Sequence, residues 1–345
     1  MAANRPASLS VIDVQSQRPT VQLSLSRVGV TGVEKVIRIR HNGATSGTSP
    51  SAAVEEQQLF SARFECVVDL GPGQKGAHMS RFEEVVNEAI GEVVLGESTF
   101  KAETLAEHIA QLVRDRQGAR RAEVSVEARF PEHKPAPVSG IQTQELYTLH
   151  GSAISSDLGT RRLIGVTAQG MTVCPCAQEL VAGSARDRLE AQGFESEEID
   201  RILDAVPVAS HNQRGLGTLH IGCTESCEDE IEALALLEIV EQAMSSEIYE
   251  LMKRSDEARV VEKAHRRPRF VEDCVREMVR GVVEAFPGLD DRAFVSARQV
   301  NLETIHQHSV VAERFGTLAE IRQELRTGVI SPAHTSRRAW LDALR

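Results

Sequence analysis

Thiols, imidazoles and a carboxylate gather in three short stretches of this sequence. Residues 170–178, Gly-Met-Thr-Val-Cys-Pro-Cys-Ala-Gln, place Cys174 and Cys176 at the end of an expected strand, where a proline turns the chain. Residues 211–214, His-Asn-Gln-Arg, add an imidazole, two amides and a guanidinium, and residues 301–308 add a carboxylate and two imidazoles. Thiolate, imidazole and carboxylate together suit a catalytic metal of the zinc or ferrous class.

Each of these groups also has an ordinary structural explanation. Cys174 and Cys176 can be explained as two small buried side chains at a strand end. A Cys-x-Cys pair alone is a weak indication of a metal site. Cys223 and Cys227 have the wider spacing of a zinc knuckle, so the four thiols together are an alternative structural site. A single histidine such as His306 is more often structural than a ligand.

A Gly-rich turn before an expected helix carries cationic and polar side chains, namely Lys75, His78, Ser80 and Arg81. Ser80 is the expected N-cap of the helix. Such a turn can capture phosphate, because the helix N-terminus adds its dipole to the charged side chains. A solvated cap with an incidental lysine is the alternative for this stretch alone.

The composition limits the classes of function. The formal net charge of the 345 residues is −11 and aromatic residues make up 4%, which argues against nucleic acid and anionic membranes as partners. No apolar run is long enough to span a bilayer, and the N-terminus lacks the apolar segment of a signal peptide. We therefore expect a cytoplasmic protein whose six cysteines are reduced.

Hydrophobic periodicity in the first half predicts the order β-β-α-α-β-β. Alternation of apolar and polar residues over 122–130 is the clearest sign of a half-buried antiparallel strand. The expected strands are 21–40, 59–70, 122–130 and 144–154, and the expected helices are 80–93 and 105–113.

The second half repeats this order with an insert. Residues 163–173 form a strand that ends at the Cys-Pro-Cys turn, and a helical insert follows. The other expected elements are a strand at 215–223, a long helix at 228–253, a helix from near 268, a strand at 294–302 and a further strand after 308.

These patterns predict an α+β protein with two modules, residues 19–158 and 159–326, each an antiparallel sheet with a helix pair on one face. The second module carries the candidate metal residues. Residues 1–18 and 327–345 are expected to be flexible, and residues 41–58 to form a long flexible loop. Joining sheets edge to edge with other subunits into a barrel would cover the open faces and edges.

Six motifs together resemble one family, the prokaryotic type IB GTP cyclohydrolases, over roughly residues 20–325. Cys-Ala-Gln after Cys-Pro, and the long insert before His211, are more similar to the archaeal methanopterin-pathway branch than to the bacterial folate-pathway branch. The resemblance implies tandem tunnelling-fold (T-fold) modules, assembled as a homotetramer or homodimer. The motifs occupy residues 75–81, 174–178, 211–214, 247–257, 270–273 and 301–306.

The resemblance also implies roles for individual residues. Glu272 matches the carboxylate that anchors the guanine edge, and Glu303 matches an acid/base residue beside the metal. Cys174 and His211 are expected to take part in catalysis as well. The implied metal ligands are Cys174, His211, Glu257 and His306.

Substrate contacts are expected from the two polar motifs. Lys75, Arg81 and Arg214 are candidates for the triphosphate because of their charge and position. The complete set of expected substrate-binding residues is Glu272, Lys75, His78, Ser80, Arg81, Gln213 and Arg214.

The implied reaction is hydrolysis of GTP with opening of the guanine imidazole ring and release of formate. One divalent metal per subunit is expected, with Fe(II) favoured and Mn(II) or Zn(II) as alternatives; bound to such ligands it activates water. The product is either 7,8-dihydroneopterin triphosphate or the 2′,3′-cyclic phosphate, so the enzyme would begin folate-type or methanopterin-type pterin synthesis.

Two alternatives remain at this point. A nitrile reductase of the same fold would use Cys174 as a covalent nucleophile and would need NADPH, although the several metal-type residues argue against it. A non-catalytic purine- or pterin-binding zinc protein would instead hold metal through Cys223 and Cys227.

Overall fold

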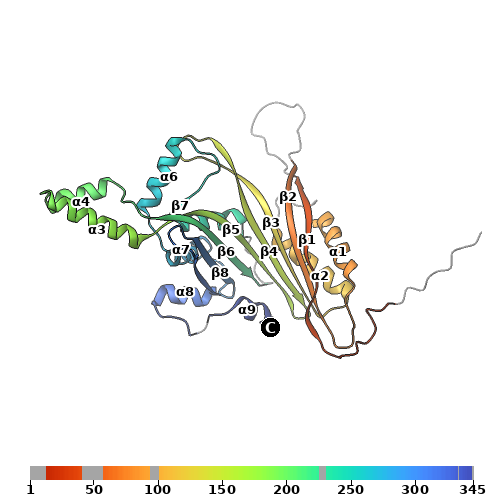
Figure 1. Ribbon diagram of the computed structural model, residues 1–345. Coiled ribbons are helices and arrows are strands. Elements are labelled where there is room, and N and C mark those ends of the chain that lie inside the picture. The colour runs from red at the N-terminus through yellow and green to blue at the C-terminus, as the bar shows by residue number, and fades with distance from the viewer. Residues whose placement is uncertain (1–12, 41–56, 94–100, 225–230, 333, 344–345) are drawn as a thin grey trace, which may run out of the picture.

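The computed structural model describes residues 13–40, 57–93, 101–224, 231–332 and 334–343, and in these it contains one nine-stranded antiparallel sheet (Figure 1). The strands follow the order β1-β2-β3-β4-β5-β6-β8-β9, and β7 pairs with β5. The strands are β1 Leu25–Arg40, β2 Gln57–Leu70, β3 Arg121–Pro135, β4 Gln142–Ser156, β5 Gly159–Val173, β6 Asn212–Cys223, β7 Ser246–Glu247, β8 Phe294–Leu302 and β9 Val310–Thr317.

Helices cover one face of this sheet. The stripe of Leu105 and Ile109 on α2 and the alternating Val124 and Val126 of β3 are buried in one core that continues to α5 and α7. The α+β class and the antiparallel sheet are therefore confirmed. The helices are α1 Met79–Val93, α2 Ala102–Gln117, α3 Pro175–Ala191, α4 Ser196–Ala205, α5 Ala233–Ala243, α6 Arg254–Arg266, α7 Val271–Ala285, α8 Leu318–Thr327 and α9 Arg337–Asp342.

The first half has the predicted order of elements, but the start of α1 differs from the expectation. The helix begins at Met79, so Ser80 lies in its first turn and is not the N-cap. The side chain of Gln117 instead brackets the preceding residue: its Oε1 accepts from the His78 backbone N at 3.2 Å, and its Nε2 donates to the His78 carbonyl at 2.8 Å.

The predicted long helix at 228–253 is wrong beyond Ala243. The chain leaves α5 there and returns to the sheet, where Ser246 and Glu247 pair with β5. The Oγ of Ser245 accepts a hydrogen bond from the Val173 backbone N at 3.1 Å. A helical pattern along the sequence cannot reveal this competing strand pairing, because the partner is more than seventy residues away.

The insert between β5 and β6 is a helical hairpin of α3 and α4 that projects from the body of the protein (Figure 1). None of the α3 residues is buried, and Leu180 is 71% exposed. The base of the hairpin is held, because Gln178 Nε2 donates to the carbonyls of Val208 and His265, both at 2.7 Å.

The prediction of a flexible tail is wrong for residues 334–343. Ser336 caps the short helix α9, and Trp340 is only 2% exposed against Ile154, Leu163 and Phe294. The indole Nε1 also donates to the Arg292 carbonyl at 2.8 Å. The tail orders because the only tryptophan finds an apolar patch on the sheet face opposite the large core.

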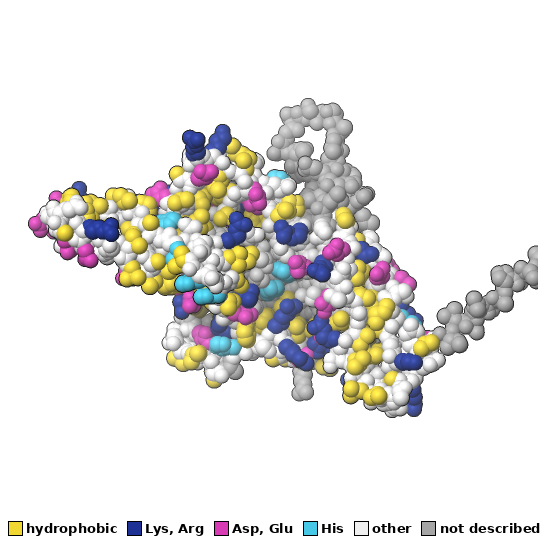
Figure 2. Space-filling model, in the orientation of Figure 1, with side chains coloured by type: hydrophobic (Ala, Val, Ile, Leu, Met, Phe, Trp, Pro, Cys, Tyr) yellow, Lys and Arg dark blue, Asp and Glu magenta, His cyan; other side chains and the backbone are white. Residues whose placement is uncertain are grey.

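The same face is polar near the middle of the sheet. The rings of His150 and His220 lie 5.2 Å apart, and with Arg63 and Arg337 they line a hollow of about 330 Å³. Figure 2 shows Lys, Arg and His side chains over this part of the molecule. Burial lowers the pKa of His220 to about 3, so this imidazole is neutral at pH 7.

The two edges of the sheet, β1 and β9, each have one neighbouring strand in the described chain. The predicted loop at 41–58 lies mostly outside the described residues, as does most of the predicted flexible segment 1–18. The backbone carbonyls of Gln15 and Gln17 within that segment accept hydrogen bonds from the Lys75 backbone N. Among the described residues, no helix is long and apolar enough to cross a membrane.

Candidate active site

Cys174 and His211 lie side by side because β5 and β6 are neighbours. The last registered pair of the ladder is Val173 with Asn212, and the Cys174 backbone N donates to the His211 carbonyl at 3.2 Å. Cys174 is also the N-cap of α3, and its Sγ accepts from the Ala177 backbone N at 3.5 Å.

Two side-chain oxygens lie near one ring nitrogen of His211. Its Nδ1 lies 3.1 Å from Gln213 Oε1 and 3.6 Å from Glu303 Oε2. The side chains of His211 and Glu303 are 14% and 7% exposed, so both are largely shielded from water. A group that holds Nδ1 leaves Nε2 available to a ligand or metal.

Glu303 comes from the loop after β8, which lies beside β6 in the sheet. The loop is tied down where Thr304 Oγ1 donates to the Asn212 carbonyl at 3.0 Å. Further along, the rings of His306 and His308 stack at 5.1 Å, and both side chains are exposed. Glu303 is therefore positioned beside His211, whereas His306 lies on the outside of the loop.

Glu257 stands exposed in the first turn of α6, next to a carboxylate that is fully buried. Asp256 accepts from the backbone N atoms of Val138 and Ser139 at 2.8 Å, from Ser139 Oγ at 2.7 Å and from the Lys253 backbone N at 2.9 Å. Burial raises the pKa of Asp256, but these hydrogen bonds outweigh burial and hold it well below the usual range. Asp256 thus locks the start of α6 to the turn between β3 and β4.

The four expected metal ligands are not gathered within one chain. Among the residues that the structure describes, no three His, Cys, Asp or Glu side chains form a metal-binding group. Cys174 and His211 do suit a divalent metal, because one is a capped thiol and the other presents a free ring nitrogen. Glu257 and His306 are exposed on separate elements.

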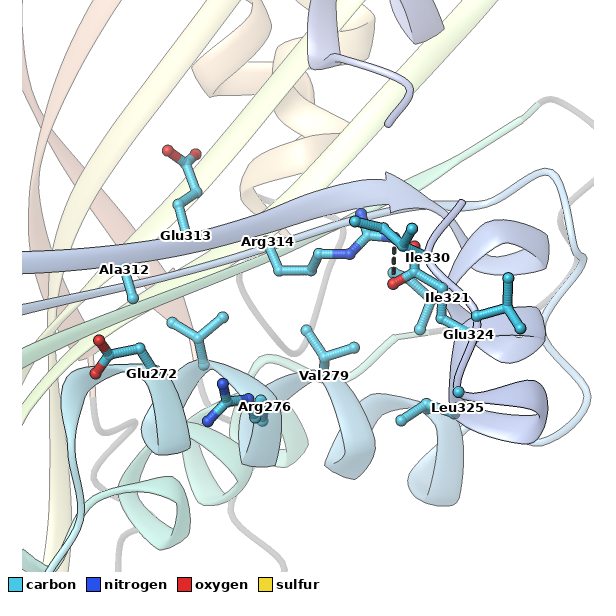
Figure 3. Close-up of a pocket in the computed structure, with 13 residues that line it drawn as sticks. Glu272, Arg276, Val279, Ala312, Glu313, Arg314, Ile321, Glu324, Leu325 and Ile330 are labelled. Carbon is cyan, nitrogen blue, oxygen red and sulfur yellow. Dashed lines mark ion pairs between the residues drawn. The ribbon is translucent and has the colours of Figure 1, made fainter. Parts of the chain in front are cut away.

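Glu272 lies at one end of a pocket of about 640 Å³ between α7, β9 and α8 (Figure 3). Val275 and Val279 of α7 and Ala312 of β9 form apolar walls, and the far end is closed by α8 and the chain after it. The carboxylate and the apolar walls suit a flat base with hydrogen-bond donors on its edge. Cys174 and His211 are not among the residues that line this pocket.

The expected phosphate cluster is also separate. Lys75 and His78 lie between β2 and α1, and Ser80 and Arg81 lie in the first turn of α1, at the opposite end of the molecule from α3 in Figure 1. Arg81 Nη1 donates to the Arg116 carbonyl at 3.0 Å, at the end of α2, and this contact is structural. Within one chain these residues do not meet Arg214, which is exposed on β6.

The alternative four-thiolate site is not formed in the described chain. Cys223 pairs with Arg162 at the opposite end of the β5–β6 ladder from Cys174. Eleven residue steps separate the two ends, which corresponds to about 37 Å along a strand. Cys223 is buried, and Cys227 lies outside the described residues.

The structure contains a polar network that no sequence pattern predicted. Glu241 of α5 accepts from Lys134 Nζ at 2.7 Å and from the Tyr147 hydroxyl at 2.8 Å. Lys134 also lies over the ring of Tyr249, whose hydroxyl donates to Glu247. The network joins the β3–β4 hairpin to the motif at 247–257, and no spacing in the sequence reports a contact between segments so far apart.

Comparisons with known proteins identify relatives of this chain. The family model described as "Type I GTP cyclohydrolase folE2" matches residues 11–312. GTP cyclohydrolase MptA of Methanocaldococcus jannaschii is 39% identical over 318 residues, which cover 91% of this chain and 97% of that protein. GTP cyclohydrolase MptA of Methanothermobacter thermautotrophicus is 39% identical over 317 residues, covering 91% and 95%.

Among solved structures, uricase from Arthrobacter globiformis superposes with a TM-score of 0.51 at 9% sequence identity, covering 91% of this chain and 98% of that chain. This likeness concerns the fold alone, whereas the sequence matches carry the family. The chain belongs to the type I GTP cyclohydrolase folE2 family.

Proposed function

We propose that the protein is a GTP cyclohydrolase that opens the guanine imidazole ring of GTP, releases formate and forms a dihydroneopterin phosphate. The observation that carries this proposal is that Cys174 and His211 lie at the paired ends of β5 and β6, with Glu303 3.6 Å from His211 Nδ1. Its family and its MptA relatives support the same reaction.

A divalent metal would be held by Cys174 and His211, with Glu257 and His306 completing the set. When bound, such an ion supplies Lewis acidity and activates water at neutral pH. Fe(II) is favoured for a thiolate and imidazole set, with Mn(II) or Zn(II) as the other candidates. The shielded position of His211 keeps bulk water from competing for the same place.

Glu303 is the proposed proton carrier of the site. Its carboxylate is almost fully shielded, and it lies close enough to His211 to exchange a proton through the imidazole or through one water. Ring opening and the second hydrolysis both need protons delivered to nitrogen, so one carboxylate beside an imidazole can serve both steps in turn.

Glu272 is the proposed guanine anchor. Its two oxygens can accept from N1–H and the 2-amino group of guanine, which adenine does not offer. The apolar walls of the pocket would then stack against the base (Figure 3). Arg214, exposed on β6, is the proposed contact for the triphosphate, together with Lys75 and Arg81 of another chain.

We also propose the tandem T-fold arrangement, assembled as a homotetramer or homodimer. The free edges β1 and β9 permit sheet-to-sheet joining, and the Glu272 pocket opens beside β9. Assembly would give a reason for the separation of the Glu272 pocket, the Lys75 cluster and Cys174 within one chain, because groups from two copies could complete one site.

The decisive test is anaerobic turnover. Purified protein is incubated with GTP and Fe(II), Mn(II) or Zn(II) in turn, and formate and the pterin product are measured by mass spectrometry. Cys174→Ala is the inactive comparison, and Cys176→Ala is the matched control, since the neighbouring thiol is exposed and caps no helix.

Formate and a neopterin species that are lost in Cys174→Ala but kept in Cys176→Ala would support the proposal. The product mass then distinguishes the triphosphate from the cyclic phosphate, and so folate-type from methanopterin-type pterin synthesis. Folded, metal-loaded protein that releases no formate with any of the three ions would refute it.

A further inference from the structure

Gln213 does not face the same side of the sheet as its neighbour Arg214. Successive side chains of a strand point to opposite faces, and β6 follows this rule. Arg214 is exposed, whereas Gln213 is only 5% exposed on the face covered by helices. The two residues were expected to contact substrate together, but Gln213 is turned away from the face that Arg214 presents.

The side-chain amide of Gln213 contacts His211 within the protein. Its Oε1 lies 3.1 Å from His211 Nδ1, which is a hydrogen-bond distance, whereas Glu303 Oε2 lies at 3.6 Å from the same nitrogen. With its amide oxygen toward the ring, Gln213 accepts a hydrogen bond from a protonated Nδ1. The neutral imidazole then has its lone pair on Nε2, and the side chain of Gln213 selects this tautomer.

A buried polar layer lies behind Gln213. Thr172 of β5 is its registered partner, and Asn301 and Gln299 of β8 follow on the same face. Gln299 Nε2 donates to Asn301 Oδ1 at 3.0 Å, and all three of these side chains are 2% exposed or less. Apolar side chains fill this face further along the strands, so the change to amides and a hydroxyl is confined to the end nearest His211.

We infer that Gln213 is a positioning residue that fixes the Nδ1–H tautomer of His211 and so presents Nε2 to the metal. The inference rests on the proposed function. The carboxylate of Glu303 is thereby spared from holding the imidazole and stays available to move protons. A neutral acceptor on a rigid strand suits this role, because it stabilises the neutral imidazole without adding a second charge beside Glu303.

The first test reads the tautomer directly and needs no metal. Protein labelled with ¹⁵N in its histidines is prepared without metal, and the two ring nitrogens of His211 are assigned by comparison with His211→Asn. We expect a protonated Nδ1 in the wild type and a mixture of tautomers in Gln213→Met, which keeps the length of the side chain but not the acceptor. Gln213→Glu keeps an acceptor at this position and should keep Nδ1 protonated.

Gln169→Met is the matched control. Gln169 lies on β5, and its odd spacing from Thr172 puts it on the opposite face, away from the buried layer. This variant should leave the ring nitrogens of His211 unchanged. Should Gln213→Met not fold, Gln213→Asn shortens the side chain by one carbon and tests the same contact.

The second test measures affinity for Zn(II) by competition with a chelating dye. Loss of a residue that orients a metal-binding histidine typically lowers affinity about 10- to 100-fold, which is the loss expected for Gln213→Met but not for Gln169→Met. An unchanged tautomer and an unchanged affinity in folded Gln213→Met would overturn the inference. A wild type that binds no metal would refute the proposed function, while the tautomer measurement would still decide the role of Gln213.

Discussion

Gly215 lies beneath the candidate site, where the structure makes a testable steric prediction. A Cβ added at Gly215 would lie 2.4 Å from Gln299 Nε2, 3.1 Å from Met244 Sδ and 3.2 Å from Thr172 Cγ2. The backbone there is ordinary strand, so alanine would meet no conformational penalty, only the crowding. Gly215→Ala therefore isolates the close packing beneath the candidate site.

The expected cost follows from these distances. Ordinary contact begins at 3.4 Å, so the amide of Gln299 must retreat by about 1 Å and lose its hydrogen bond to Asn301. Overpacking of this kind costs about 1–3 kcal/mol, and a lost buried hydrogen bond adds about 1 kcal/mol. We expect Gly215→Ala to lower the free energy of unfolding by about 2–4 kcal/mol.

Gly183→Ala provides the opposite result in the same protein. Gly183 lies inside α3, and an added Cβ would find no atom within 4 Å. Alanine there should raise the free energy of unfolding by about 0.5–1 kcal/mol, because glycine is a poor helix former.

The assay is equilibrium unfolding in urea, followed by far-UV circular dichroism for the wild type and both variants. The two substitutions should shift the midpoint in opposite directions with similar slopes. A Gly215→Ala protein as stable as the wild type would refute the packing described for Gln299, Met244 and Thr172. A Gly183→Ala protein destabilised by more than about 1 kcal/mol would show instead that α3 is not the open helix described above.

Three further outcomes are expected. Trp340→Ala should lower the free energy of unfolding by about 3–5 kcal/mol in urea titrations, because the indole is buried on the sheet; an unchanged midpoint would mean that the tail does not pack there. Burial lowers the pKa of His220 to about 3 from its usual 6.5, so the unfolded chain takes up a proton first and the stability is lost as the pH falls from 6.5 toward 3. As the pH is lowered across this range, the free energy of unfolding should fall more steeply for the wild type than for His220→Gln. Equal slopes would contradict the burial of His220. Glu272→Gln should narrow the preference for GTP over inosine triphosphate, which lacks the 2-amino group, by about 10-fold in kcat/KM; an unaltered preference would remove Glu272 from base recognition.

Much of the architecture was predictable because periodicity reports which side of an element is buried. The alternation over 122–130 predicted β3, and the apolar stripe of Val271, Val275, Met278 and Val282 predicted α7. The ends of these elements were less predictable. β3 continues to Pro135 through residues without alternating burial, and pairing with β4 holds that extension.

The candidate site was predictable as a list of residues but not as an arrangement. Cys174, His211 and Glu303 were singled out by their chemistry, and the neighbouring strands β5, β6 and β8 bring them together. The burial of Gln213 was not predictable, because the registers of β5 and β8 decide which face of β6 is buried. The packing of the tail was unpredictable for a similar reason, since the residues that contact Trp340 come from β4, β5 and β8.

The sequence by itself determined most of the secondary structure, the chemical groups and the family, because these depend on neighbouring residues and on ordered motifs. Tertiary structure alone decided which of those groups meet. Asp256 fixes the start of α6 only because the β3–β4 turn supplies hydrogen-bond donors to its carboxylate. Glu247 is extended rather than helical because it pairs with β5. Long-range pairing and burial made these choices, and local periodicity carries no record of partners more than a hundred residues away.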